Sequence, residues 1–89
     1  MKPKILVLGA TGVLGLKLLK HLQSLNISTH TAVCYKNINL LQKYSKKFDI
    51  KNIFSLTNNL DYEELKKILY KVKFDIIYCL DSNLTSFPL

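Results

Sequence analysis

The stretch that decides the fold covers residues 4–15 and reads Lys4-Ile5-Leu6-Val7-Leu8-Gly9-Ala10-Thr11-Gly12-Val13-Leu14-Gly15. Its first part is a short continuous apolar run that ends at Gly9, which is typical of a strand buried on both faces of a parallel sheet. After Gly12 the period changes, because leucines recur at helical spacing with lysines on another face. These leucines are Leu14, Leu18, Leu22 and Leu25. The stretch therefore predicts a strand, a tight turn and a helix.

The rest of the chain continues this alternation. Residues 28–34, 52–57 and 74–80 are rich in β-branched or other apolar residues and predict three more strands. Two amphipathic helices lie between them, one capped by Asn37 and one opened by the capping-box pair Asp61 and Glu64. Their apolar sides carry Ile38, Leu41, Tyr44 and Phe48 in the first helix, and Leu65, Ile68, Leu69 and Val72 in the second.

Strands that alternate with helices through short loops predict an α/β fold. We expect a Rossmann-like parallel sheet of four strands in the order 3-2-1-4, with helices on both faces. The 89 residues form one domain, residues 1–89. Residues 74–80 are almost unbroken in their apolar character, although the predicted order puts them at a sheet edge. We therefore expect the chain to be the N-terminal part of a longer enzyme, or this edge to be covered by a missing C-terminal region or by a homodimer partner.

Composition excludes several classes of protein. The chain is 48% hydrophobic and 21% charged, as expected of a globular domain, and no apolar stretch reaches the roughly 18 residues that span a bilayer. All 13 basic residues are lysines, and no acid precedes Asp49, so residues 1–48 hold the positive excess. Nucleic-acid sites usually combine arginine with aromatic residues, and arginine is absent here. We expect neither a nucleic acid nor a membrane as partner.

All three glycines of the chain lie in one loop, as Gly9, Gly12 and Gly15, which form a G-x-x-G-x-x-G pattern between the first strand and the first helix. Gly9 permits the sharp turn, and Gly15 lets the helix lie close to the strands. Gly12 has no side chain to keep a pyrophosphate away from the amides at the helix N-terminus, and Thr11 can add a hydroxyl donor. The loop predicts a dinucleotide-binding site, with a tight turn that holds no ligand as the alternative.

The end of the second predicted strand favours NADPH over NADH. About 20 residues after the loop, NAD-binding proteins place an acid on the ribose 2′-hydroxyl. This chain has Lys36 and Asn37 there instead. Lys36 can pair with a 2′-phosphate and Asn37 can donate a hydrogen bond to it. An ordinary solvated lysine is the alternative for Lys36.

Residues 9–15, the Lys36-Asn37 pair with Leu41, and Phe48 together resemble the N-terminal NADPH-binding domain of 1-deoxy-D-xylulose 5-phosphate reductoisomerase. That family has G-S-T-G-S-I-G in the loop, G-K-N-x-x-x-L after the second strand and a phenylalanine that ends the second helix. The similarity covers about residues 3–70. Here Tyr35 replaces the glycine before Lys-Asn, Val13 replaces a serine, and Asp49 stands where a residue near proline is usual.

The resemblance implies an oxidoreductase of non-mevalonate isoprenoid biosynthesis, in which this domain seats the hydride donor. It implies that Thr11, Gly12, Val13 and Leu14 contact the cofactor phosphates, with Lys36 and Asn37 around the adenosine ribose and its 2′-phosphate. No catalytic or metal-binding residue of the family falls within the chain, so a divalent metal is expected only in a missing catalytic part. Whether the chain alone is an enzyme stays open.

Two other functions remain as alternatives. Tyr62 and Lys66 match the Tyr-x-x-x-Lys pair of short-chain dehydrogenases, but lie too early in the predicted topology. The chain could therefore begin an atypical short-chain dehydrogenase or another GxxGxxG reductase. A non-catalytic dinucleotide-sensing or interaction module would use the exposed fourth-strand edge. Asp81 and Ser82 follow that strand, where contact with the nicotinamide is one interpretation and a solvated loop the other.

Cysteine usage indicates a reducing compartment. Cys34 and Cys79 fall on the second and fourth predicted strands, which flank the first, so about two strand spacings of 4.8 Å separate them. That separation exceeds the reach of a disulfide. We expect two reduced, buried thiols and a cytoplasmic protein. The two histidines, His21 and His30, show no pattern that points to a function.

Overall fold

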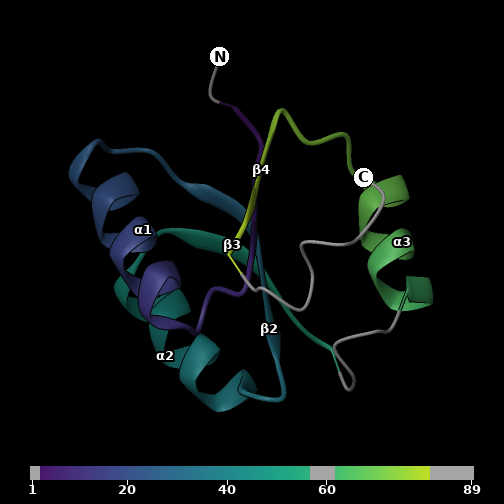
Figure 1. Ribbon diagram of the computed structural model, residues 1–89. Helices are drawn as coiled ribbons and strands as arrows, with labels where there is room; N and C mark the ends of the chain where they lie inside the picture. Colours follow the sequence, from purple (N-terminus) through teal and green to yellow (C-terminus); the bar gives the residue numbers. More distant parts are fainter. Residues whose placement is uncertain (1–2, 57–61, 81–89) are drawn as a thin grey trace.

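The computed structural model describes residues 3–56 and 62–80. Its centre is β1 (Ile5–Leu8), in which all four side chains are buried. The other elements follow in the order α1 (Val13–Ser24), β2 (Thr29–Tyr35), α2 (Ile38–Lys47), β3 (Ile50–Leu56), α3 (Tyr62–Lys71) and β4 (Ile76–Cys79) (Figure 1). The predicted alternation of strands and helices is confirmed.

The four strands form one parallel sheet in the order β3-β2-β1-β4. Leu6 of β1 lies opposite Thr31 of β2 on one side and Ile77 of β4 on the other. The chain thus adds β2 and β3 on one side of β1, and then crosses over to add β4 on the other. This is the predicted 3-2-1-4 order of a Rossmann-like α/β fold.

Helices cover both faces of the sheet, as predicted. α1 and α2 lie on one face and α3 on the other (Figure 1). The core on the α1–α2 side includes Ile5, Val7, Leu19, Cys34 and Leu41. The core on the α3 side consists of Leu6, Leu8, Val33, Leu56 and Leu65, because alternate residues of each strand point to opposite faces.

The bounds of β3 and β4 and the cap of α2 differ in detail from the prediction. β3 begins at Ile50 instead of residue 52, because Thr29 of β2 already lies opposite Ile50 and extends the ladder. β4 is shorter than the predicted 74–80, because Asp75 at its start bonds to Lys4 and only Ile76–Cys79 pair with β1. Asn37 occupies the N-cap position of α2 as predicted, but its side chain makes no capping hydrogen bond. Asp61, of the predicted capping box, lies outside the described residues.

The predicted apolar stripe of α1 is partly wrong. Leu22 is buried, but Leu14 is 59% and Leu25 is 53% exposed. The face of α1 that meets the sheet carries Gly15, Leu19 and Leu22. Because successive helical residues are about 100° apart, contact at Gly15 rotates Leu14 toward the surface. Leu25 lies beyond the last helical residue, Ser24.

β4 forms an apolar sheet edge, as the sequence predicted. Ile76 is 38% and Ile77 is 37% exposed, and as neighbours in a strand they face opposite sides of the sheet. What covers this edge stays a prediction. Within residues 3–56 and 62–80, no helix is both long and apolar enough to cross a bilayer.

Candidate functional site

The glycine loop is fixed at the carboxyl end of the two central strands. Gly9 has φ of 84°, a left-handed conformation that favours glycine. The chain turns there, and the N–H groups of Gly9 and Ala10 both donate to the carbonyl oxygen of Val33, at 2.9 and 3.0 Å. These two bonds hold the loop against the end of β2. The predicted role of Gly9 in a sharp turn fits this geometry.

Gly15 packs so tightly that no side chain fits. A Cβ on Gly15 would approach the carbonyl oxygen of Gly9 to 2.6 Å and the backbone of Ala10 still more closely. Real Cβ atoms do not come this near, and the obstacle is backbone that cannot swing away. The first turn of α1 can therefore rest against the loop only with glycine at this position.

Gly12 is different, because neither its conformation nor its packing requires glycine. It is the N-cap of α1, with φ of −76° and ψ of 175°, a region open to every residue type. A Cβ there would meet only the carbonyl oxygen of Gly9, at an ordinary contact distance of 3.6 Å. Serine or asparagine would cap the helix better than glycine does. The missing side chain thus leaves open surface at the point where the helix begins.

The first turn of α1 presents free backbone donors at that surface. Leu16 makes the first bond of the helix, to the carbonyl oxygen of Gly12 at 3.0 Å. The N–H groups of Val13 and Leu14 precede it, and N-terminal N–H groups have no partner within a helix. Thr11 is half-buried beside them, and Val13 and Leu14 are exposed. Partial positive charge at this helix end suits an anion.

Lys36 and Asn37 lie at the neighbouring strand end. Lys36 has φ of 59°, and its N–H donates to the carbonyl oxygen of Leu56 at 3.1 Å, which ties β2 to β3. Its Nζ lies 5.1 Å from the centre of the Tyr35 ring, in a cation–π contact. The side chains of Lys36 and Asn37 are both exposed. The left-handed residue here is thus Lys36, one position after the glycine of the reductoisomerase motif.

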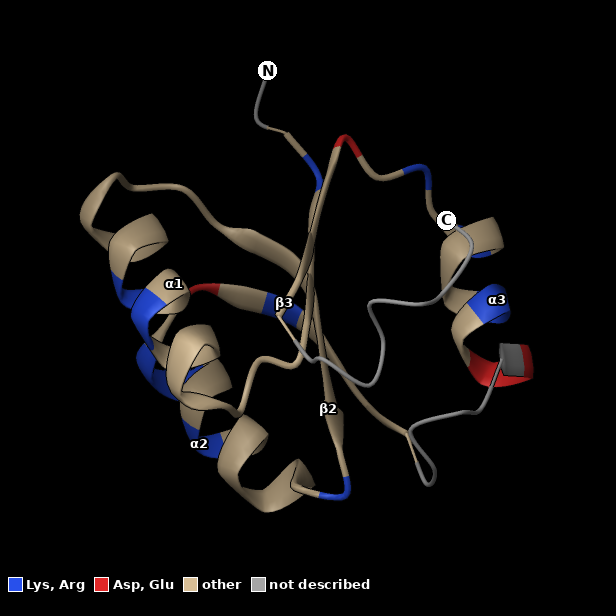
Figure 2. Cartoon of the chain, viewed as in Figure 1, with Lys and Arg blue, Asp and Glu red and all other residues tan. Residues whose placement is uncertain are grey.

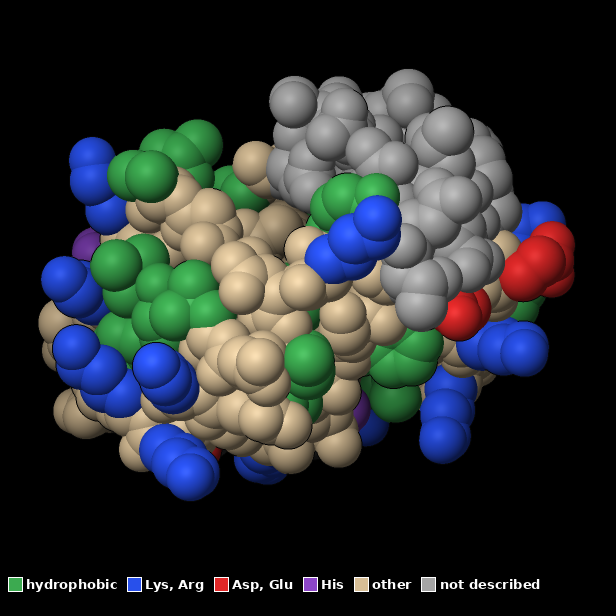
Figure 3. Space-filling view, turned by 90° about the horizontal axis from the view of Figure 1, so that it is seen from below, with side chains coloured by type: hydrophobic (Ala, Val, Ile, Leu, Met, Phe, Trp, Pro, Cys, Tyr) green, Lys and Arg blue, Asp and Glu red, His purple; other side chains and the backbone are tan. Residues whose placement is uncertain are grey.

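The topology brings the two segments together at the carboxyl-terminal end of the sheet. Leu8, at the end of β1, lies opposite Val33 in β2, so the loop after β1 and the turn after β2 leave the sheet side by side. Figure 3 looks onto this end of the sheet and shows lysines around a group of hydrophobic side chains on the α1–α2 side. Neither residues 9–15 nor residues 35–37 contain an acid. The described acids lie just before β3, in the first turn of α3 and just before β4 (Figure 2).

Other residues singled out in the sequence do not belong to this site at the carboxyl-terminal end of the sheet. Cys34 is buried in β2 as expected, whereas Cys79 in β4 is only half-buried, and neither forms a disulfide. Tyr62 and Lys66 lie on α3, directly after β3. Asp81 and Ser82 lie outside the described residues. Among those the structure describes, no group of three or more His, Cys, Asp or Glu could hold a metal ion.

One polar cluster, around His30, could not be predicted from the sequence. The His30 ring lies between Thr31, bonded to its Nδ1 at 2.9 Å, and Phe74, whose ring centre is 5.6 Å away in an edge-to-face arrangement. Together with Asn52 and Lys71, His30 and Thr31 line a cavity. The cluster joins residues from two strands, one helix and a loop, so no local sequence pattern could reveal it.

The chain was compared with protein-family models and with curated proteins, and neither comparison gave a match.

Proposed function

We propose that the chain is the NADPH-binding domain of an oxidoreductase similar to 1-deoxy-D-xylulose 5-phosphate reductoisomerase. The observation that carries the proposal is the state of Gly12. This glycine is exposed at the N-cap of α1 with no conformational or packing need for glycine. A bound pyrophosphate would explain the glycine, because its oxygens must come within hydrogen-bond distance of the helix amides.

The residues at the carboxyl-terminal end of the sheet suit the cofactor. Gly9 and Gly15 shape the loop, and the hydroxyl of Thr11 and the N–H groups of Val13 and Leu14 would donate to the phosphates. The N–H of Gly12 already donates to the carbonyl oxygen of Gly9 at 3.3 Å, so Gly12 would contact the phosphates through its bare Cα. Lys36 would pair with the 2′-phosphate and Asn37 would donate to it, and an acid that would repel this phosphate is absent from both segments. When bound, NADPH supplies a hydride. The chain's own part is to hold and orient the cofactor, and residues outside it would act on the substrate.

The test is a pair of fluorescence titrations, one with NADPH and one with NADH. NADPH is expected to bind more tightly. Lys36→Asp should lower NADPH affinity by about tenfold and leave NADH affinity much less changed, because a lost ion pair and a new repulsion add. Lys43→Asp is the matched control, since Lys43 is an exposed lysine in α2 away from the strand end.

A second variant tests the loop itself. Gly12→Ala places a methyl group where the pyrophosphate would lie but fits the fold. It should therefore weaken both cofactors together while the circular dichroism spectrum stays unchanged. If the wild-type chain binds neither cofactor, the proposal fails. Equal losses of NADPH and NADH affinity in Lys36→Asp would remove Lys36 from the site and leave the loop in place.

A further inference from the structure

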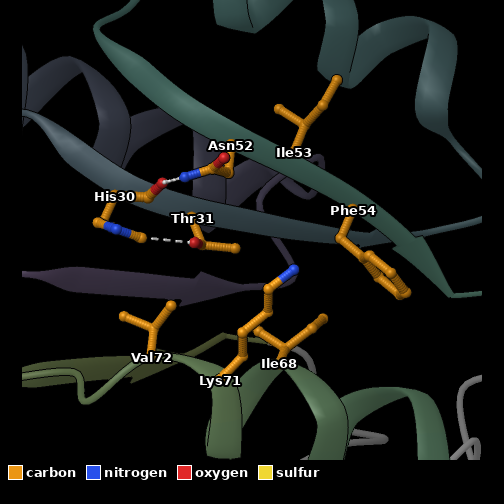
Figure 4. A pocket seen from close by; sticks show the side chains of 8 residues that line it. All are labelled: His30, Thr31, Asn52, Ile53, Phe54, Ile68, Lys71 and Val72. Carbon is orange, nitrogen blue, oxygen red and sulfur yellow. Dashed lines mark hydrogen bonds between the residues drawn. The ribbon is translucent and has the colours of Figure 1, made fainter.

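A cavity of about 230 Å³ lies between α3 and the β2–β3 half of the sheet (Figure 4). It is on the face opposite α1 and α2, and it includes Thr31 and Asn52, which lie opposite each other in β2 and β3. Both residues are in the amino-terminal half of their strands. The cavity is therefore at the other end of the sheet from the glycine loop, and it is not part of the proposed cofactor site.

One wall of the cavity is a polar group held in place by hydrogen bonds. Asn52 Nδ2 donates to the carbonyl oxygen of His30 at 3.0 Å, and His30 Nδ1 shares a hydrogen bond of 2.9 Å with Thr31 Oγ1. When Thr31 is the donor, the ring proton of His30 is on Nε2. These bonds leave Nε2 and the second amide hydrogen of Asn52 as donors for a ligand.

Lys71 provides a positive charge from the opposite wall. It belongs to the last turn of α3, and its side chain extends across the cavity toward the strands (Figure 4). No acid in the described part of the chain is paired with it, and no acid lines this cavity. A cation and neutral donors without an acid favour an anionic ligand.

The remaining walls are apolar. Phe54 from β3 and Ile68 from α3 line the cavity. Both residues, together with Lys71, also line an adjoining cavity of about 330 Å³ that continues along α3. Lys67 and Glu64 stand at that second cavity. The space beside Phe54 and Ile68 suits a flat apolar body, while the charged part of a ligand reaches Lys71.

We propose that this cavity binds a small organic carboxylate with a flat apolar body, independently of the dinucleotide. Lys71 pairs with the carboxylate, Asn52 and His30 donate to it, and Phe54 and Ile68 contact the body. The chemistry is binding alone, with no bond made or broken. The proposal does not depend on the cofactor proposal, because no residue is shared by the two sites.

Benzoate is the probe, and the measurement is an NMR titration of backbone amides without any dinucleotide. Saturable shifts are expected at Thr31, Asn52, Phe54 and Lys71, with the glycine-loop amides unmoved. Benzamide has the same ring without the charge, and inorganic phosphate has charge without the ring. Both should bind more weakly than benzoate. Absent or unsaturable shifts with benzoate, or equal shifts with either control, would overturn the proposal.

A pair of variants assigns the effect to Lys71. Lys71→Gln should weaken benzoate binding by about two- to fivefold, the range of a single exposed ion pair. Lys66→Gln is the matched control, since Lys66 is an exposed lysine of the same helix that lines neither cavity. Because both side chains are exposed, both variants should fold. Equal affinity in the two variants would contradict the assignment.

Discussion

The backbone of Ala10 lies against Gly15 so closely that a single added carbon at Gly15 cannot be accommodated. Glycine is elsewhere a poor residue inside a helix, where alanine is usually better by about 1 kcal/mol. In α1 this preference is reversed by the contact with the loop. The same contact sets which side of α1 faces the sheet.

Gly15→Ala is therefore expected to lower the free energy of unfolding by about 1 to 3 kcal/mol, the usual cost of overpacking. Urea denaturation followed by circular dichroism measures this change. Gly12→Ala is the control in the same loop and should stay within about 1 kcal/mol of wild type, because its Cβ meets only an ordinary contact. Equal losses in the two variants would contradict the packing described for Gly15.

The folded protein should be less stable with alanine at position 36 than with glycine there. Lys36 has φ of 59°, a left-handed conformation that costs a residue with a Cβ about 1 to 2 kcal/mol. Lys36→Gly and Lys36→Ala both remove the charge and the contact with Tyr35, so their difference isolates the backbone. The glycine variant is expected to be more stable by about 1 kcal/mol in urea denaturation. A more stable alanine variant would contradict this conformation.

The two thiols should differ in reactivity. Cys34 is 2% exposed, whereas Cys79 is half-buried in an edge strand. Ellman's reagent is expected to label Cys79 first in the native protein and to reach Cys34 only as the protein unfolds. Mild oxidation should form no bond between them, since β1 lies between β2 and β4. Mass spectrometry of the labelled and oxidised chains measures both outcomes, and an intrachain disulfide in the native protein would contradict the strand order.

Asp75 should stabilise the junction between β1 and β4. Its Oδ2 accepts a hydrogen bond of 2.7 Å from the backbone N–H of Lys4, while the N–H groups of Asp75 and Ile76 both donate to the carbonyl oxygen of Lys4. Asp75→Ala is expected to cost about 1 kcal/mol of stability, and Asp75→Asn should cost less because it keeps an acceptor. Hydrogen exchange at the Lys4 amide measures the local effect, and unchanged exchange in Asp75→Ala would exclude the bond.

Much of the architecture was predictable because it depends on hydrophobic period. The continuous run of β1 and the helical spacing in α2 and α3 each match the structure, and Leu41 and Leu65 are buried as expected. The parallel sheet and its strand order follow from the short crossovers between such elements. The loop position between β1 and α1 was predictable for the same reason.

The errors came from features that residue spacing does not show. The spacing predicted close packing at Gly15, but it did not show that this contact turns Leu14 outward. Nor can it show that His30 meets Phe74 and lines a cavity with Lys71, because these residues belong to separate elements. The left-handed conformation of Lys36 was also missed, since lysine rarely adopts it.

The hydrogen bond between Lys4 and Asp75 joins residues 71 positions apart. Closing so long a loop costs more chain entropy than joining β1 to β2, and native contacts of this range form slowly. We therefore expect β1, β2 and β3 to assemble first, and β4 to dock last and to open first. During synthesis on the ribosome, β1 emerges early, and the side of β1 that pairs with β4 has no strand partner until Ile76–Cys79 have been synthesised.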